Sequence, residues 1–332
     1  MDFTQIDIVN DLVMNNVRNS YTNNTGGITY NISGDCLITG DSLKVDFLTS
    51  TPCFWNVQGD FIIQNVDDIQ NVDASGSSTS AYVFNWNDDL GGNVNVYFAP
   101  KNIAGTDGWK IWEGNISDSW FVDDNWIPRE RLQSNEVGLV DGKVSNNDIR
   151  TSVGLPFAGL SATNSYVGNW DWDGTNHVVT KFIKLRDVGG TMDAGSGKLT
   201  FNGTGIDFEL PFGGRVSVVE VGIGSDVTYE GNPGAGVLSN LADSGGIAPN
   251  GFIQNFGTFT INRGFMVEGD VPLGAGGTYV QGTAPGIRLL HGGGIFDAGS
   301  NILGCSLSII GTPANMAACD FQDAVYISDP RS

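Results

Sequence analysis

The sequence predicts an all-β protein, a parallel β-helix-like stack with one short N-terminal α-helix. The chain has 47 glycines in 332 residues, whereas an average protein has roughly 7% glycine. These glycines separate short β-branched and aromatic runs such as Arg215–Val221 and Phe259–Ile261, a pattern typical of strands joined by tight turns. A β-sandwich or jelly-roll is the alternative fold.

The helix is expected within residues 5–20. Thr4 and Asp7 resemble a capping box, and apolar residues follow with helical spacing. These residues are Ile6, Val9, Leu12, Val13 and Val17. We expect this stripe either to pack on the first strands of its own chain or to dock against another subunit.

Four regions are expected along the chain. Residues 1–27 hold the helix and a linker, and residues 28–104 form a first β region with recurring Gly-Asp turns. Residues 105–177 form a tryptophan-rich insertion or subdomain, and residues 178–332 form a glycine-rich β array. The strands of this array start at irregular intervals, which fits a parallel β-helix with variable loops better than a propeller.

The charge of the chain disfavours some classes of partner. Its 37 acidic residues outnumber 16 Lys and Arg, for a net charge of −21. Such a surface repels phosphate backbones, so we expect no nucleic acid partner. No apolar stretch is long enough to predict membrane insertion. Residues 1–5 lack the pattern of a secretory signal, so we expect assembly in a cytoplasm.

Cysteine and histidine indicate little site chemistry. Cys36, Cys53, Cys305 and Cys319 lack the spacing of a metal site. We expect reduced, buried thiols, with pairing of 36 to 53 and of 305 to 319 as the alternative. His177 and His291 are isolated from each other and are expected to be polar turn residues.

The strongest metal candidate is Asn169-x-Asp171-x-Asp173-Gly174. Oxygen ligands at alternate positions before a glycine can wrap Ca²⁺. An EF-hand loop starting at Asn169 would have Thr180 in place of its bidentate Glu. An Asx-rich turn joining two strands is therefore the alternative, and we expect no other cofactor.

Carbohydrate contacts are considered at two places. Exposed tryptophans could stack on sugar rings, although a small tryptophan-rich core is the alternative. The tryptophans concerned are Trp109, Trp112, Trp120, Trp126, Trp170 and Trp172. A polysaccharide lyase or glycoside hydrolase would need facing carboxylates or a cationic base. Candidates for these are Asp207, Glu209 and Glu220 with Lys198 and Arg215.

One segment carries a family resemblance. Trp120-Phe121-Val122-Asp123-Asp124-Asn125-Trp126-Ile127-Pro128, followed by Glu136–Val140, resembles a W…NW…P motif of large bacterial and phage surface proteins. In those families the motif leads into a right-handed parallel β-helix. Gly189–Ala194 and Gly197–Phe201 look like coils of the same kind. The resemblance implies this fold and an extracellular or virion setting, and it brings no catalytic residues.

We therefore expect a non-enzymatic structural or adhesive subunit of a virion, such as a phage fibre, spike or capsid-decorating protein. Its expected partners are copies of itself, with a trimer favoured, other virion proteins and a cell-surface glycan. We expect assembly in a host cytoplasm and display on the virion. A secreted bacterial adhesin or filament subunit at the cell surface is the first alternative, and a polysaccharide-active β-helix enzyme is the second.

Overall fold

The computed structural model forms two compact units, unit 1 (Met1–Trp109) and unit 2 (Lys110–Ser332). No helix among the described residues is long and apolar enough to cross a bilayer. The described residues are 5–17, 27–40, 52–154, 156–172, 174–185, 192–193, 197–210, 215–229, 246–261, 265–268, 271–274, 278–281, 287–290, 295–297, 302–304, 307–310 and 320–322.

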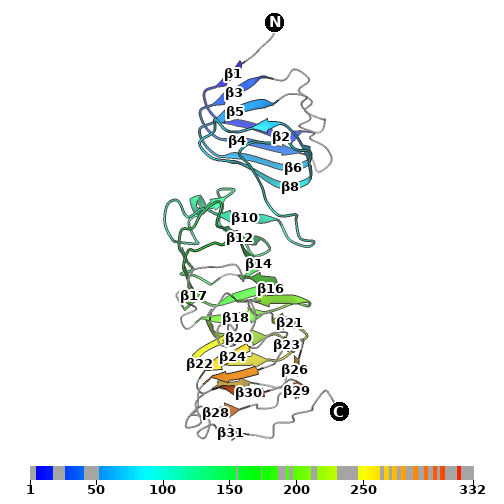
Figure 1. The fold of residues 1–332 in the computed structure, drawn as a ribbon, viewed down its shortest axis with the longest axis vertical. Helices are drawn as coiled ribbons and strands as arrows, with labels where there is room; N and C mark the ends of the chain where they lie inside the picture. Colours follow the sequence, from blue (N-terminus) through cyan, green and yellow to red (C-terminus); the bar gives the residue numbers. More distant parts are fainter. Residues whose placement is uncertain are drawn as a thin grey trace. The chain divides into compact units, whose positions relative to one another are not determined.

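Unit 1 is a parallel β-solenoid with two sheets. Its strands are β1 Gln5–Ile8, β2 Leu12–Val17, β3 Thr29–Ile32, β4 Cys36–Gly40, β5 Cys53–Val57, β6 Phe61–Ile69, β7 Val72–Asp73, β8 Ala81–Asp89 and β9 Val96–Phe98. One sheet has the order β1-β3-β5-β7 and the other β2-β4-β6-β8-β9 (Figure 1). Strands alternate between the sheets because each coil contributes one strand to each.

The predicted N-terminal helix is wrong for residues 5–17, which form β1 and β2. Ile6 and Ile8 on β1 and Leu12 and Met14 on β2 alternate with polar or exposed residues and pack against the core. This period of two is the period of a strand, and the β-branched residues favour it. Val9, a residue of the predicted helical stripe, is 81% exposed.

The other docking candidates of the predicted stripe also take strand positions. Val13 lies on β2 with an exposed side chain. Val17 is the last residue of β2, and its side chain lies outside the described part of the chain. The five residues therefore do not share one face, and the docking of a helix has no basis in residues 5–17.

The first three coils of unit 1 repeat one pattern. The first coil is residues 5–16, the second 29–40 and the third 54–65, and Asp7, Asn31 and Asn56 stand in register. Asn31 Nδ2 donates to Asp7 Oδ1 at 2.7 Å, and Asn56 Nδ2 donates to Asn31 Oδ1 at 2.7 Å. We call this row the amide ladder.

A second row runs along the corner between the two sheets. The backbone N–H of Asp35 donates to Asp11 Oδ1 at 2.9 Å, and that of Asp60 donates to Asp35 Oδ1 at 2.8 Å. We call this row the aspartate ladder. A Cβ on Gly34 would lie 2.0 Å from Asp11 Oδ1, so only glycine lets the carboxylate of the previous coil approach. The recurring Gly-Asp turns of the sequence therefore mark contacts between coils.

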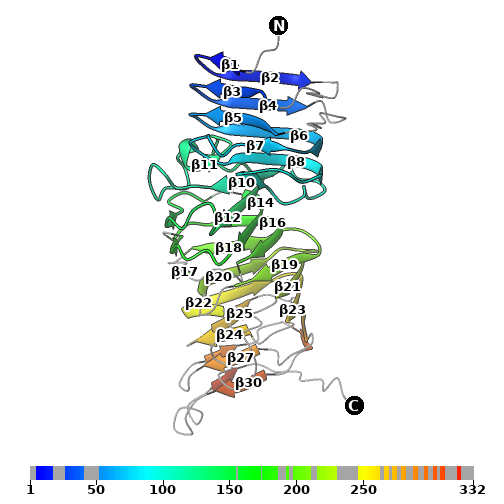
Figure 2. The same ribbon diagram turned by 45° about the horizontal axis from the view of Figure 1, so that its top comes forward.

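Unit 2 is a longer solenoid. Its elements are β10 Trp109–Trp112, the 3-10 helix η1 Asp123–Asn125, β11 Trp126–Ile127, β12 Val137–Asp141, β13 Ile149–Arg150, β14 Pro156–Thr163, β15 Trp170–Asp171, β16 His177–Lys184, β17 Met192–Asp193, β18 Lys198–Phe201, β19 Ile206–Glu209, β20 Arg215–Val221, β21 Asp226–Tyr229, β22 Gly246–Asn255, β23 Thr258–Ile261, β24 Phe265–Glu268, β25 Val271–Gly274, β26 Thr278–Gln281, β27 Ile287–Leu290, β28 Ile295–Asp297, β29 Ile302–Gly304, β30 Leu307–Ile310 and β31 Asp320–Gln322. Strands of successive coils stack in register, as β24, β27 and β30 do (Figure 2). β10 and β11 pair antiparallel.

The strand pairing in unit 2 shows a repeated offset in sequence between paired residues. The positions at which the strands begin in the sequence did not show this repeat. Pro156 pairs with Val178 and His177 with Leu199, each 22 residues apart. The offset is 32 residues where Asp226 pairs with Thr258, and it is 20 where Thr258 pairs with Thr278. One longer connection between β21 and β22 therefore accounts for much of the apparent irregularity.

We predict that Gly34→Ala destabilises the protein by about 1–3 kcal/mol, the usual range for overpacking. The cause is the contact between the new Cβ and Asp11 Oδ1. Urea unfolding should show this loss, and Gly34→Ala should cost much less in an Asp11→Ala background, because that change removes the clashing oxygen. Equal costs in the two backgrounds would contradict this account of the corner.

Candidate functional site

The buried charges of unit 2 gather near its first strands. Lys110 and Glu113 lie on or next to β10, and each is 5% exposed. Lys110 and Glu113 stand on either side of Ile111 and Trp112, whose pairing with β11 fixes the backbone at this point. Because a buried charge is costly unless it is paired, the partners of these two residues decide what the cluster does.

Lys110 lies between two carboxylates. Its Nζ is 3.1 Å from Glu130 Oε2 and 3.6 Å from Glu136 Oε1. Glu136 Oε2 also accepts the backbone N–H of Gln133 at 2.8 Å. Burial raises the pKa of Glu136, and the Gln133 N–H and the Lys110 charge oppose that rise.

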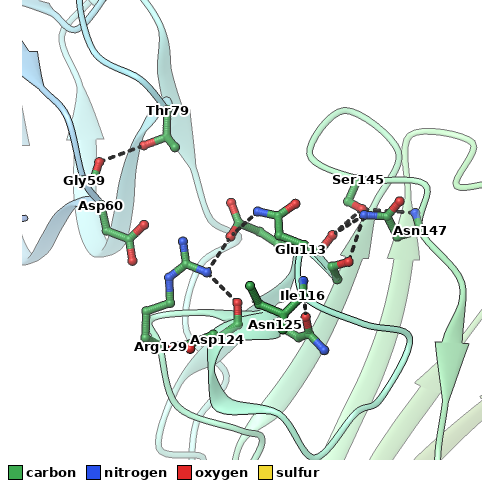
Figure 3. A network of polar contacts seen from close by, with 12 residues as sticks. Gly59, Asp60, Thr79, Glu113, Ile116, Asp124, Asn125, Arg129, Ser145 and Asn147 are labelled. Atoms are coloured by element: carbon green, nitrogen blue, oxygen red, sulfur yellow. Dashed lines mark hydrogen bonds and ion pairs between the residues drawn. The ribbon is translucent and has the colours of Figure 1, made fainter.

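Glu113 has its own cationic partner. Arg129 Nη1 is 3.2 Å from Glu113 Oε2, and Asn115 Nδ2 donates to the same oxygen at 3.0 Å. Arg129 also donates to the backbone carbonyl of Asp124 (Figure 3). The Glu113 carbonyl accepts hydrogen bonds from Ser145 Oγ at 2.6 Å and Asn147 Nδ2 at 2.9 Å. Both the side chain and the backbone of Glu113 are thus held.

Asn125 organises the loop beside this cluster and is fully buried. Its Oδ1 accepts the backbone N–H of Ile116 at 2.9 Å (Figure 3). It also accepts the backbone N–H of Ser117 at 3.2 Å. Its Nδ2 donates to Ser117 Oγ at 3.0 Å and to the Ser119 carbonyl at 2.8 Å. An Asn can make four such bonds through one amide, which explains the Asn of the Asn125-Trp126 pair.

The tryptophans proposed for sugar stacking lie inside the protein. Trp112, Trp120, Trp126, Trp170 and Trp172 belong to the core of unit 2 and are 0–2% exposed. Trp120 meets Trp126 edge to face with ring centroids 5.1 Å apart. Rings without a free face cannot stack on a glycan, so the structure contains the alternative, a tryptophan-rich core. Trp109, at the end of unit 1, is 9% exposed.

His177 also belongs to this core and does not occupy an exposed turn. It is 2% exposed at the start of β16, and its Nε2 is 2.8 Å from Thr175 Oγ1. Its ring lies edge to face with Trp172, with centroids 5.2 Å apart. The apolar surroundings and the Thr175 contact give this histidine a packing role. His291 lies outside the described residues.

The proposed calcium ligands are only partly described. The Asn169 backbone N–H donates to Asp148 Oδ1 at 2.7 Å, and Asp171 Oδ2 lies 3.8 Å from Arg150 Nε across adjacent coils. Asp173 lies outside the described residues. Within the described ranges no three His, Cys, Asp or Glu side chains form a group that could hold a metal. Calcium at this turn stays a prediction.

The residues considered for lyase or hydrolase chemistry are placed along the coils. Lys198 Nζ lies 2.8 Å from Glu220 Oε2, and Lys184 Nζ lies 2.8 Å from Asp207 Oδ2. Each pair joins one coil to the next. The side chain of Arg215 is not described. Glu220 and Asp207 therefore sit in two separate ion pairs.

The described cysteines are buried thiols. Cys36 and Cys53 are reduced thiols, not joined in a disulfide, and both lie in the core of unit 1. Burial raises the pKa of Cys36 to about 12, so this thiol is unreactive near neutral pH. Cys305 and Cys319 lie outside the described residues.

Sequence reasoning did not single out the buried charges of unit 2. Lys110 and Glu113 flank the Ile111-Trp112 pair, and a charged residue on either side of this apolar pair was the available signal. Glu130 and Glu136 follow Pro128 in an irregular stretch, and only the folded chain shows that both face Lys110.

Comparison with known proteins gives no relative. No protein-family model matches the chain, and neither a curated protein nor a solved structure matches it significantly.

We predict that Lys110→Met destabilises the protein by about 3 kcal/mol, the low end for breaking a buried ion pair. Glu136, which is largely buried, would lose the cation beside its Oε1. Lys143→Met is the matched control, because Lys143 is exposed and surface changes usually stay within about 0.5 kcal/mol. Urea unfolding measures both variants, and equal stabilities would contradict a role for the Lys110 cluster.

The raised pKa of Glu136 gives a pH prediction. Because the folded chain binds this proton more readily than the unfolded chain, the contribution of Glu136 to stability should increase as the pH falls from about 7 toward about 4. Glu136→Gln should lack that increase. The difference in unfolding free energy between wild type and Glu136→Gln, measured at several pH values, should shift in favour of the wild type in acid. A difference independent of pH would contradict the assigned cause.

Proposed function

We propose that this protein is a structural or adhesive subunit of a virion, such as a phage fibre, spike or capsid-decorating protein. The observation that carries the proposal is how the solenoid uses its polar side chains. Along unit 1 the amide ladder and the aspartate ladder join coil to coil. Along unit 2 the ion pairs Lys184–Asp207 and Lys198–Glu220 do the same.

Such ladders favour a mechanical role. Each coil of a solenoid contacts only its neighbours, so the strength of each unit depends on every junction between its coils. Hydrogen bonds and ion pairs between side chains of adjacent coils add to the parallel β pairing across the same junctions. The acidic composition, with its net charge of −21, keeps a β-rich surface soluble and away from nucleic acid.

The proposal extends to partners and place. The subunit assembles with copies of itself, with a trimer as the favoured arrangement, and with other virion proteins. It is made in a host cytoplasm, and it displays a face that can meet a cell-surface glycan. A bacterial adhesin or filament subunit uses the same solenoid at a cell surface and is the alternative. The ion-paired state of Glu220 and Asp207 argues against the enzyme alternative.

We predict that the chain co-purifies with particles. Cultures that produce the protein would be separated into particles, cell envelope and medium, and the chain would be quantified by mass spectrometry in each fraction. Enrichment with particles supports the virion role, and enrichment in the cell envelope supports the adhesin. Incubation of the purified chain with a polysaccharide panel is the control for catalysis. New reducing ends or unsaturated products there would overturn the non-enzymatic assignment.

A further inference from the structure

The first coil of unit 1 differs from the next two at the positions that form the ladders. Where the second and third coils have Asn31 and Asn56, the first has Asp7. Where they have Gly34 and Gly59 before the corner aspartate, the first has Asn10. The inward-facing apolar positions and the corner aspartate Asp11 are kept, and the changes at Asp7 and Asn10 fall on the two ladders.

Asp7 ends the amide ladder. Each amide donates to the coil before it, from Asn56 to Asn31 and from Asn31 to Asp7. An ionised carboxylate has no hydrogen to donate, so Asp7 cannot continue the amide ladder by donating a hydrogen bond to a preceding coil. Gln5 Nε2 donates to Asp7 Oδ1 at 2.8 Å and to Oδ2 at 3.0 Å. The Asn31 and Gln5 hydrogen bonds lower the pKa of Asp7 and so favour its charged form.

Asn10 ends the aspartate ladder. A Cβ at Gly34 would lie 2.0 Å from the carboxylate oxygen of the coil before, and one at Gly59 would lie 2.1 Å away. Asn10 has that Cβ and a larger side chain. The first corner therefore has no room for a carboxylate approaching from a preceding coil in the same geometry.

The edge that these residues occupy would otherwise invite association. β1 and β2 are the outermost strands of their two sheets in the described part of the chain. Ile6, Ile8, Leu12 and Met14 on them are only partly buried, whereas Ile32 and Ile38 in the second coil are 1% and 0% exposed. A sheet edge beside half-covered apolar side chains is a template for pairing with another chain.

We infer that the first coil is a built-in stop, in which Asp7 and Asn10 prevent this edge from pairing with a second copy of the chain. A copy stacked with the ladder geometry would lack a donor from Asp7 and would collide at Asn10. In a two-fold arrangement β1 would meet its own copy antiparallel, which brings both Asp7 charges to one edge, and like charges there oppose pairing. This inference holds whether or not the protein belongs to a virion.

The test restores the ladder residues in the full chain. Asp7→Asn with Asn10→Gly copies the second coil, and Asp7→Asn alone isolates the charge. Asp107→Asn is the matched control, because it removes one charge from an exposed loop of unit 1. Sedimentation velocity over a hundredfold concentration range would give the mass of each, and urea unfolding would confirm that each is folded.

We expect the double variant to form larger species than the wild type as its concentration rises, while Asp107→Asn keeps the wild-type mass. Hydrogen exchange should then show new protection in Gln5–Ile8 and Leu12–Val17, which localises the contact to this edge. A double variant with unchanged mass would overturn the inference. So would a wild type whose own association already protects these two strands. If the double variant fails to fold, Asp7→Asn alone decides by the same measurements.

Discussion

The whole structure depends on the fit between one coil and the next. Parallel strands about 4.8 Å apart leave no space between coils for a side chain that does not match its neighbour. The corner of unit 1 shows how strict this is, because Asp35 fits over Asp11 only where Gly34 has no Cβ. The same separation lets amides and opposite charges bond directly from coil to coil. The residues that fit at a position in one coil therefore depend on the residues of the coil before it.

Unit 2 begins with a polar network of a different kind. Its first strands carry buried charges, and these form ion pairs, Lys110 with Glu136 and Glu113 with Arg129. The Asn125 side chain accepts the backbone N–H of Ile116 and donates to the backbone carbonyl of Ser119 in the neighbouring loop. The tryptophan core lies beside this network and is itself anchored, since Trp126 Nε1 donates to the Trp120 carbonyl at 2.8 Å. Hydrophobic burial and polar pairing thus act together where the solenoid starts.

Local patterns predicted the architecture better than they predicted individual contacts. Glycine-separated β-branched runs indicated stacked strands, and the W…NW…P segment does stand at the start of a parallel solenoid. The helix over residues 5–17 was wrong because this segment carries two overlapping apolar patterns. Ile6, Val9 and Val13 fit a helical stripe, whereas Ile6, Ile8, Leu12 and Met14 fit the inward positions of two strands. In so short a segment, the periodicity of apolar residues does not distinguish a helix from a strand. The segment is a pair of strands because it pairs with β3 and β4 of the next coil.

Contacts between coils could not be read from the chain alone. Lys198 and Glu220 are 22 residues apart, and their ion pair depends on the register of β18 with β20. The burial of Trp120 and Trp170 likewise depends on coils that meet only after folding. The sequence shows where the charged and aromatic residues stand, but it does not show which of their side chains face the interior.

The longer offset between β21 and β22 shows how such a fold can change in evolution. The extra length there leaves the pairing of Val219 with Ile253 and of Asp226 with Thr258 intact. The sequence between β21 and β22 can therefore lengthen while the strands on either side keep their pairing. Sequence can diversify at that point while the scaffold stays constant, and the same point offers a position for grafting foreign peptides.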